Sequence, residues 1–88
     1  MKYFVFSVYD SVANVYAPPF YMASPNVAVR AFALAANTPD SKMAQHSADF
    51  TLFQLGEFDD AVGIHHPCEP HINLGLAASF KKEIASAS

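Results

Sequence analysis

The chain has 88 residues, of which 52% are hydrophobic and 15% are charged, and its formal net charge is −3. This apolar content excludes general disorder, and the acidic balance argues against strong non-specific binding of nucleic acid by a single copy. The lone cysteine, Cys68, excludes an intrachain disulfide and favours an intracellular setting. The sequence predicts neither a secretory leader nor a membrane span, because no apolar run is long enough.

A chain of this length is expected to form a single domain, which we place at residues 1–84, with a flexible tail at residues 85–88. So short a domain buries only a modest fraction of its surface. Its apolar residues therefore exceed what one copy can hide, and we expect a homo-oligomer, a dimer or a larger assembly.

The first third of the chain is predicted to be extended. Residues 2–9 carry aromatic and β-branched side chains at both alternating sets of positions, which is typical of a central strand covered on both faces. A turn at residues 10–14 precedes a second extended segment at residues 15–22. Pro18 and Pro19 cannot donate ladder hydrogen bonds, so this second strand is expected to be an edge or to be interrupted.

A helix is expected to begin after Ser24, a good N-cap, with Pro25 at its first position, and to run to about Asn37. Arg30 is its only charge, and it needs either a water-facing position or a partner, which could be a carboxylate such as Asp10 or Asp49, or a phosphate. The helix is apolar on several sides, which indicates packing on more than one side. Its apolar stripe comprises Val27, Ala31, Leu34 and Ala35, and Ala28, Phe32 and Ala36 widen it.

The remaining segments suggest a short helix within residues 38–46, a strand at residues 50–58 and a hairpin turn at residues 59–63. A return strand begins at residue 64 and is expected to be broken by Pro67 and Pro70, followed by a short helix or an extended arm at residues 74–84. The order β-β-α-β-β predicts an α+β fold with a small antiparallel sheet of about four strands and one main helix packed on one face. The other face of the sheet is then a candidate dimer surface.

A cluster of potential metal ligands lies in the return strand and comprises His65, His66, Cys68 and His71. Such side chains can bind zinc, within one chain or across an oligomer. Adjacent His65 and His66 would point to opposite faces of a strand, however, and a polar loop explains the composition equally well. We therefore predict no metal and no other cofactor.

Catalytic chemistry is not indicated by the remaining polar residues. Cys68 beside His66 or His71 resembles a nucleophile–base pair, but no local feature would activate the thiol. Asp59 and Asp60 are typical of a turn. We predict no catalytic residue and no enzymatic activity.

Aromatic residues are frequent in the predicted strands, and they allow two interpretations. They can fill the core, or on an exposed sheet face they can stack on unpaired bases. The residues concerned are Tyr3, Tyr9, Tyr16, Phe20, Tyr21, Phe53 and Phe58.

The order of several short motifs resembles the small nonstructural protein of gokushovirus-type microviruses, which are single-stranded-DNA phages. The likeness covers residues 3–60. Its first block consists of Ser7-Val8-Tyr9-Asp10, Tyr16, Pro19-Phe20, Ala28, Arg30 and Phe32. Its second block consists of His46, Asp49-Phe50, Leu52-Phe53, Leu55-Gly56 and Phe58-Asp59.

This resemblance implies a nonstructural accessory protein of phage genome replication in the host bacterial cytoplasm. Our leading hypothesis is that it binds single-stranded DNA as a homo-oligomer. Its phosphate contacts would be Lys2, Arg30 and Lys42, so that binding weakens steeply with salt. Its base contacts would be Tyr9, Tyr16 and Tyr21. The alternative is a protein–protein adaptor that docks on the phage replication initiator, a capsid precursor or a host factor, without nucleic acid.

Overall fold

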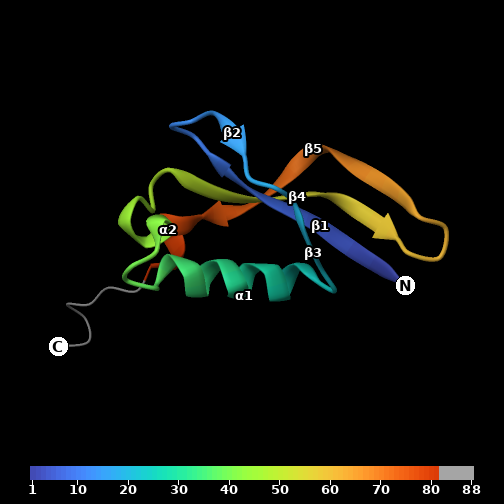
Figure 1. The fold of residues 1–88 in the computed structure, drawn as a ribbon, viewed down its shortest axis with the longest axis horizontal. Helices are drawn as coiled ribbons and strands as arrows, with labels where there is room; N and C mark the ends of the chain where they lie inside the picture. The colour runs from blue at the N-terminus through green and yellow to red at the C-terminus, as the bar shows by residue number, and fades with distance from the viewer. Residues whose placement is uncertain (82–88) are drawn as a thin grey trace.

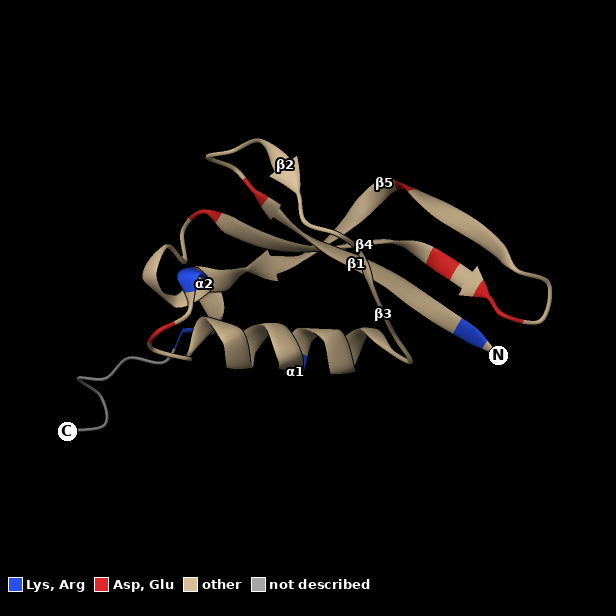
Figure 2. Ribbon diagram, in the orientation of Figure 1, with Lys and Arg blue, Asp and Glu red and all other residues tan. Residues whose placement is uncertain are grey.

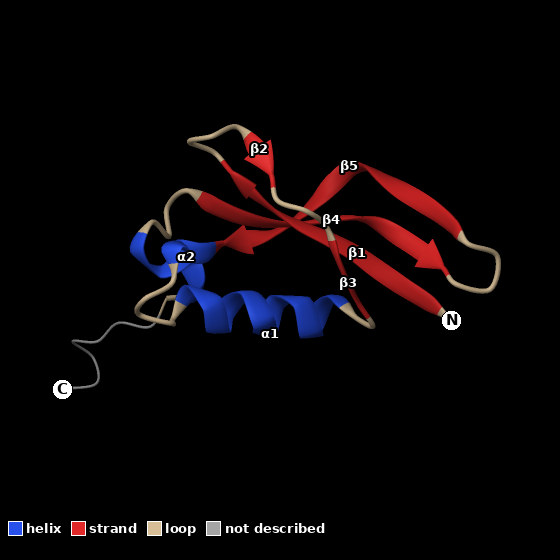
Figure 3. Ribbon diagram, viewed as in Figure 1, coloured by secondary structure: helices blue, strands red, loops and turns tan. Residues whose placement is uncertain are grey.

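The computed structural model describes residues 1–81, so the expected domain boundary at residue 84 and the tail at residues 85–88 lie outside the described residues. The predicted α+β class is confirmed, with an antiparallel sheet and one main helix (Figures 1 and 3). The strands are β1 (Lys2–Asp10), β2 (Val15–Tyr16), β3 (Phe20–Met22), β4 (Phe50–Asp59) and β5 (Ile64–Leu76). The helices are α1 (Pro25–Ala36), α2 (Lys42–Gln45) and α3 (Ala77–Phe80).

Two short strands pair with successive halves of β1, where a single second strand was expected. β3 pairs with the first half, placing Tyr21 opposite Val5, and β2 pairs with the second half, placing Tyr16 opposite Tyr9. Pro18 and Pro19 lie between them and cannot donate ladder hydrogen bonds, which explains the interruption and raises the strand number to five.

The longest pairings join β1 to β4 and β4 to β5, giving the order β2-β1-β4-β5, with β3 beside β1. β1 is central in this sheet, as predicted. The helices lie on one side of the sheet (Figure 1), and the middle of β1 is buried on both faces as expected, because Val5 and Ser7 are 7% and 0% exposed on the side opposite to Phe6. We call the side away from α1 the open face.

α1 begins and ends close to the predicted positions because its capping residues bond as expected. The Ser24 hydroxyl accepts a hydrogen bond from the backbone N–H of Val27, and Pro25 occupies the first turn. At the other end, the Asn37 side-chain amide donates to the carbonyls of Ala33 and Phe80, at 2.8 and 2.9 Å. This end of α1 is thereby tied to α3.

The core lies between α1 and the covered side of the sheet. Its buried members are Phe6, Ala28, Phe32, Ala36, Leu52 and Ala77. Val27 and Leu34, by contrast, are 47% and 71% exposed. The predicted apolar stripe is therefore misplaced: Val27 and Leu34 face solvent, whereas the residues expected only to widen it, Ala28, Phe32 and Ala36, face the core.

β5 continues through Pro67 and Pro70, so the expected break in this strand is wrong. The chain instead forms a wide bulge, in which residues 68–71 of β5 face only Leu55 of β4. A bulge leaves its extra residues outside the ladder, and prolines are tolerated there. None of the helices within residues 1–81 is long and apolar enough to cross a membrane.

Candidate functional site

Tyrosines from adjacent strands share the open face. Side chains alternate along a strand, so Phe4, Phe6 and Val8 of β1 contact the core, whereas Tyr3 and Tyr9 point the other way. The pairings Val5–Tyr21 and Tyr9–Tyr16 add a tyrosine from β3 and from β2. Tyr16 and Tyr21 are 45% and 46% exposed, so their rings are accessible on this face.

The first aromatic cluster of the open face comprises Tyr9, Tyr16, Phe53 and His71. The rings of Tyr9 and Tyr16 are 4.8 Å apart, and Tyr16 also lies 5.9 Å from Phe53 and 5.9 Å from His71. The Tyr9 hydroxyl donates to the side-chain oxygen of Asn14 in the turn after β1. These contacts fix the ring planes, while one side of Tyr16 stays open to solvent.

The second aromatic cluster comprises Tyr21, Phe58 and His65. The Phe58 and His65 rings are 4.6 Å apart, and the Tyr21 ring lies 5.9 Å from each of them. The Tyr21 hydroxyl is 2.9 Å from Nε2 of His65, within hydrogen-bonding distance. The cluster therefore joins β3, β4 and β5 near the hairpin end of the sheet.

A bulge in β4 brings Phe53 and Phe58 to the same face. With strict alternation, residues five positions apart would lie on opposite faces of a strand. The register between β1 and β4 shifts between Val5 and Phe6, where Leu55 has no partner on β1. This one-residue shift reverses which side chains of the second half of β4 point to each face, so Phe58 lies on the open face together with Phe53.

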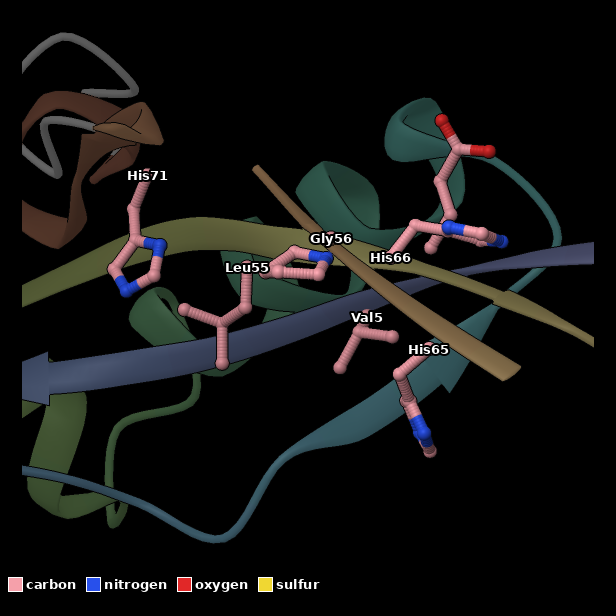
Figure 4. A pocket seen from close by; sticks show the side chains of 8 residues that line it. Val5, Leu55, Gly56, His65, His66 and His71 are labelled. Atoms are coloured by element: carbon pink, nitrogen blue, oxygen red, sulfur yellow. The ribbon is translucent and has the colours of Figure 1, made fainter. Parts of the chain in front are cut away.

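A pocket of about 330 Å³ lies between the two aromatic clusters. Figure 4 shows the side chains of Val5, Leu55, His65 and His71 directed to the same side of the sheet, with a histidine at each end. Gly56 lies beneath, where a Cβ would overlap the His66 carbonyl oxygen and come within 2.9 Å of Pro67 Cα. The close approach of β5 over β4 therefore requires glycine at this position.

The histidines and cysteine of β5 make separate contacts. His65 belongs to the second cluster, His71 to the first, and His66 lies opposite Glu57. Figure 4 shows His65 and His66 extending in different directions, as expected for neighbours in a strand. Among residues 1–81, no group of three or more His, Cys, Asp or Glu side chains could hold a metal ion.

Two hydrogen bonds hold the wide bulge of β5 in place. The Cys68 thiol donates to the Gln54 carbonyl at 3.1 Å, and His71 Nδ1 lies 3.1 Å from the Cys68 carbonyl. A carbonyl oxygen only accepts, so Nδ1 carries the hydrogen and Nε2 is the nitrogen that His71 can offer to a ligand. The cysteine thus has a structural role, and the bulge aims the imidazole of His71.

The basic residues predicted to contact phosphate do not join the tyrosines. Lys2 lies 3.9 Å from the Glu57 carboxylate, Arg30 lies on α1 and Lys42 on α2. Lys81 donates to the Ala44 carbonyl at 2.8 Å. Figure 2 shows these charges at the start of β1 and along the helices. Within residues 1–81, no lysine or arginine shares the open face.

Acidic residues gather at the end of the β4–β5 hairpin, beside the N-terminus (Figure 2). The amino group of Met1 lies 2.7 Å from an Asp60 side-chain oxygen. Its hydrogen bond to Asp60 and the charge of that carboxylate raise the pKa of the amine above its usual 8.0. This pair joins the start of β1 to the hairpin turn.

Comparison with known families identifies the origin of the chain. Residues 3–80 match the model of a family described as Phage ORF5 protein. The chain belongs to this family. No curated protein and no solved structure gave a match. The phage origin implied by the resemblance is thus confirmed, and the match extends beyond residue 60 to include the bulge of β5 and α3.

Sequence reasoning proposed the tyrosines of this phage protein as base contacts, which stays a prediction, and it missed the pocket. Val5, Leu55 and Pro67 carry no motif, and they come together only through the two bulges. The histidines were noticed as potential metal ligands rather than as members of aromatic clusters. A useful signal was the proline pair at residues 67 and 70, which marks an irregular strand.

Proposed function

We propose that this phage protein is a non-enzymatic accessory of genome replication that binds single-stranded DNA through the open face, as a homo-oligomer in the host cytoplasm. The observation that carries the proposal is the pair of aromatic clusters on one uncovered sheet face. Base–aromatic stacking contributes roughly 1–3 kcal/mol per base and tolerates any sequence. The microvirus resemblance of residues 3–60 supports the same ligand.

The charge distribution defines how such binding would respond to salt. Salt dependence grows with the number of phosphates that are neutralised. Lys2, Arg30 and Lys42 lie away from the tyrosines, and Lys2 is paired with Glu57. The steep salt dependence expected from the sequence is therefore replaced by a shallow one, with stacking as the main contribution.

Self-association has a separate surface available, on the outer side of α1. Val27 and Leu34 are exposed there, and Ala31, a small residue, lies between them on the same side of the helix. The same patch on a second copy would complement it about a two-fold axis, because small residues allow two helices to approach closely. An oligomer formed in this way would leave the open face accessible.

The direct test is a binding titration with a fluorescein-labelled strand of about 16 thymidines, followed by fluorescence anisotropy at low salt. We expect Tyr16→Ala and Tyr21→Ala each to weaken binding by about tenfold, which corresponds to the loss of one stacked base. Val62→Ala, which shortens an exposed side chain in the hairpin turn, is the control and should bind normally. Absence of binding by the unmodified protein would refute the proposal.

A protein–protein adaptor is the second candidate, and the lack of lysine and arginine on the open face within residues 1–81 favours it. Its ligand would be the phage replication initiator, a capsid precursor or a host protein, bound through the aromatic clusters. Mixing the protein separately with the labelled strand and with each purified phage protein, and then measuring mass, distinguishes the two candidates. An increase in mass with a phage protein alone would support the adaptor.

A further inference from the structure

The pocket of the open face lies on the path between the two aromatic clusters. His65, at one end, belongs to the second cluster, and His71, at the other end, belongs to the first. An extended ligand that runs from His65 to His71 therefore crosses the pocket (Figure 4). Its volume of about 330 Å³ is at the lower end of the range for small-ligand sites, which is roughly 300–1,000 Å³.

We infer that the pocket receives one unstacked nucleobase of a single strand, while the neighbouring bases stack on Tyr16 and Tyr21. This inference rests on the proposed function, and it adds a discrete three-base site to the aromatic face. Unstacked bases are recognised by aromatic and apolar surfaces together with a few polar groups at the base edge. The pocket offers both kinds of group.

The aliphatic part of the pocket suits the flat face of a base. Val5 and Leu55 point into it from adjacent strands, and Pro67 covers Gly56 from β5. Val5 is only 7% exposed, so it forms a fixed floor. A base placed on this floor would exchange water for apolar contact on one side, which is favourable.

The polar part of the pocket is supplied by the histidines at its ends. His71 donates through Nδ1 to the Cys68 carbonyl, so its Nε2 can accept a hydrogen bond from a base. His65 is positioned by its contact with the Tyr21 hydroxyl. Glu57 and His66 border the pocket, but their side chains alternate to the other side of the sheet from His65, and the carboxylate of Glu57 lies near Lys2.

The spacing of the tyrosines agrees with a three-base site. Tyr21 lies opposite Val5 and Tyr16 opposite Tyr9, so the tyrosines are separated by the length of β1 between those partners. At roughly 3.3 Å per residue, this length is about 13 Å. Three stacked nucleotides, at about 3.4 Å per step, would be too short to reach both rings. A trinucleotide that contacts both tyrosines must therefore open its stack, which frees the middle base for the pocket.

The test compares a thymidine trinucleotide with the same trinucleotide lacking its central base, each titrated into the protein and followed by NMR. For the unmodified protein, we expect the missing base to weaken binding by about tenfold. For His71→Ala the difference should shrink to less than about twofold, because the pocket has lost one end. His46→Ala, which alters an exposed histidine after α2, should keep the full difference.

The outcomes separate this inference from the proposed function. Equal binding of the two trinucleotides to the unmodified protein would overturn the base pocket, as would an undiminished difference in His71→Ala. Failure of both trinucleotides to bind at millimolar concentration would also overturn it. In each case the longer thymidine strand still tests the proposed function, because stacking on Tyr16 and Tyr21 does not require the pocket.

Discussion

Cys68 shows how one side chain can support an irregular strand through a single hydrogen bond. Residues 68–71 bulge out of β5, and the thiol fixes the bulge to β4 by donating to the Gln54 carbonyl. Gln54 is 8% exposed, so water has little access to replace this bond. Leaving a buried acceptor without a donor costs about 1–3 kcal/mol, with the lower end appropriate for a weak thiol donor.

We therefore predict that Cys68→Ala lowers the free energy of unfolding by about 1 kcal/mol, measured by urea denaturation. Cys68→Ser, the matched variant, keeps a donor of similar shape and should lose less. If the alanine and serine variants proved equally stable, the hydrogen bond would not be what holds the bulge.

α1 illustrates how far an element can be read from sequence. Its ends were predicted correctly because Ser24, Pro25 and Asn37 act locally, through caps that depend on few neighbours. Its buried side could not be chosen, because apolar residues occur nearly all round and only tertiary packing selects one side. The side with Phe32 is buried rather than the side with Leu34, because the Phe32 ring packs against the Phe80 ring in the core, with their centroids 5.7 Å apart.

The strands also show that local signals can be recognised in the sequence, whereas features that depend on tertiary contacts cannot. The proline pair at residues 18 and 19 indicated the interruption between β2 and β3, because proline removes a donor from the ladder. The bulges at Leu55 and at residues 68–71 were not predictable, because a register shift depends on which residues of two distant segments meet. The sequence therefore placed the tyrosines in strands, whereas the pocket between the clusters could not be predicted.

The exposed side of α1 leads to a prediction about assembly. We expect Leu34→Gln to lower the mass measured by sedimentation velocity, because it removes the largest exposed apolar side chain of the proposed helix contact. Stability should change little, since leucine and glutamine have similar helix propensities. Val12→Gln, at a position with 72% exposure in the turn after β1, is the control and should keep the original mass. An unchanged mass for Leu34→Gln would remove α1 as the contact.

At the scale of the whole molecule, two apolar surfaces lie on opposite sides of a flat, two-layered fold, one on the sheet and one on α1. The molecule measures 51 × 26 × 20 Å, and α1 covers only part of the extended sheet (Figure 1). One surface carries the aromatic clusters and the pocket, and the other carries Val27, Ala31 and Leu34. Under the proposed function, this separation would let the protein associate with itself through α1 while the sheet face contacts a ligand.

The central claim is that the open face contacts single-stranded DNA, and NMR shift mapping with an unlabelled thymidine strand tests it most directly. We predict that the resonances of Tyr16, Tyr21, His65 and His71 move during the titration, while those of Val27 and Leu34 on α1 do not. Shifts confined to α1, or no shifts at all with a large excess of the strand, would contradict the account.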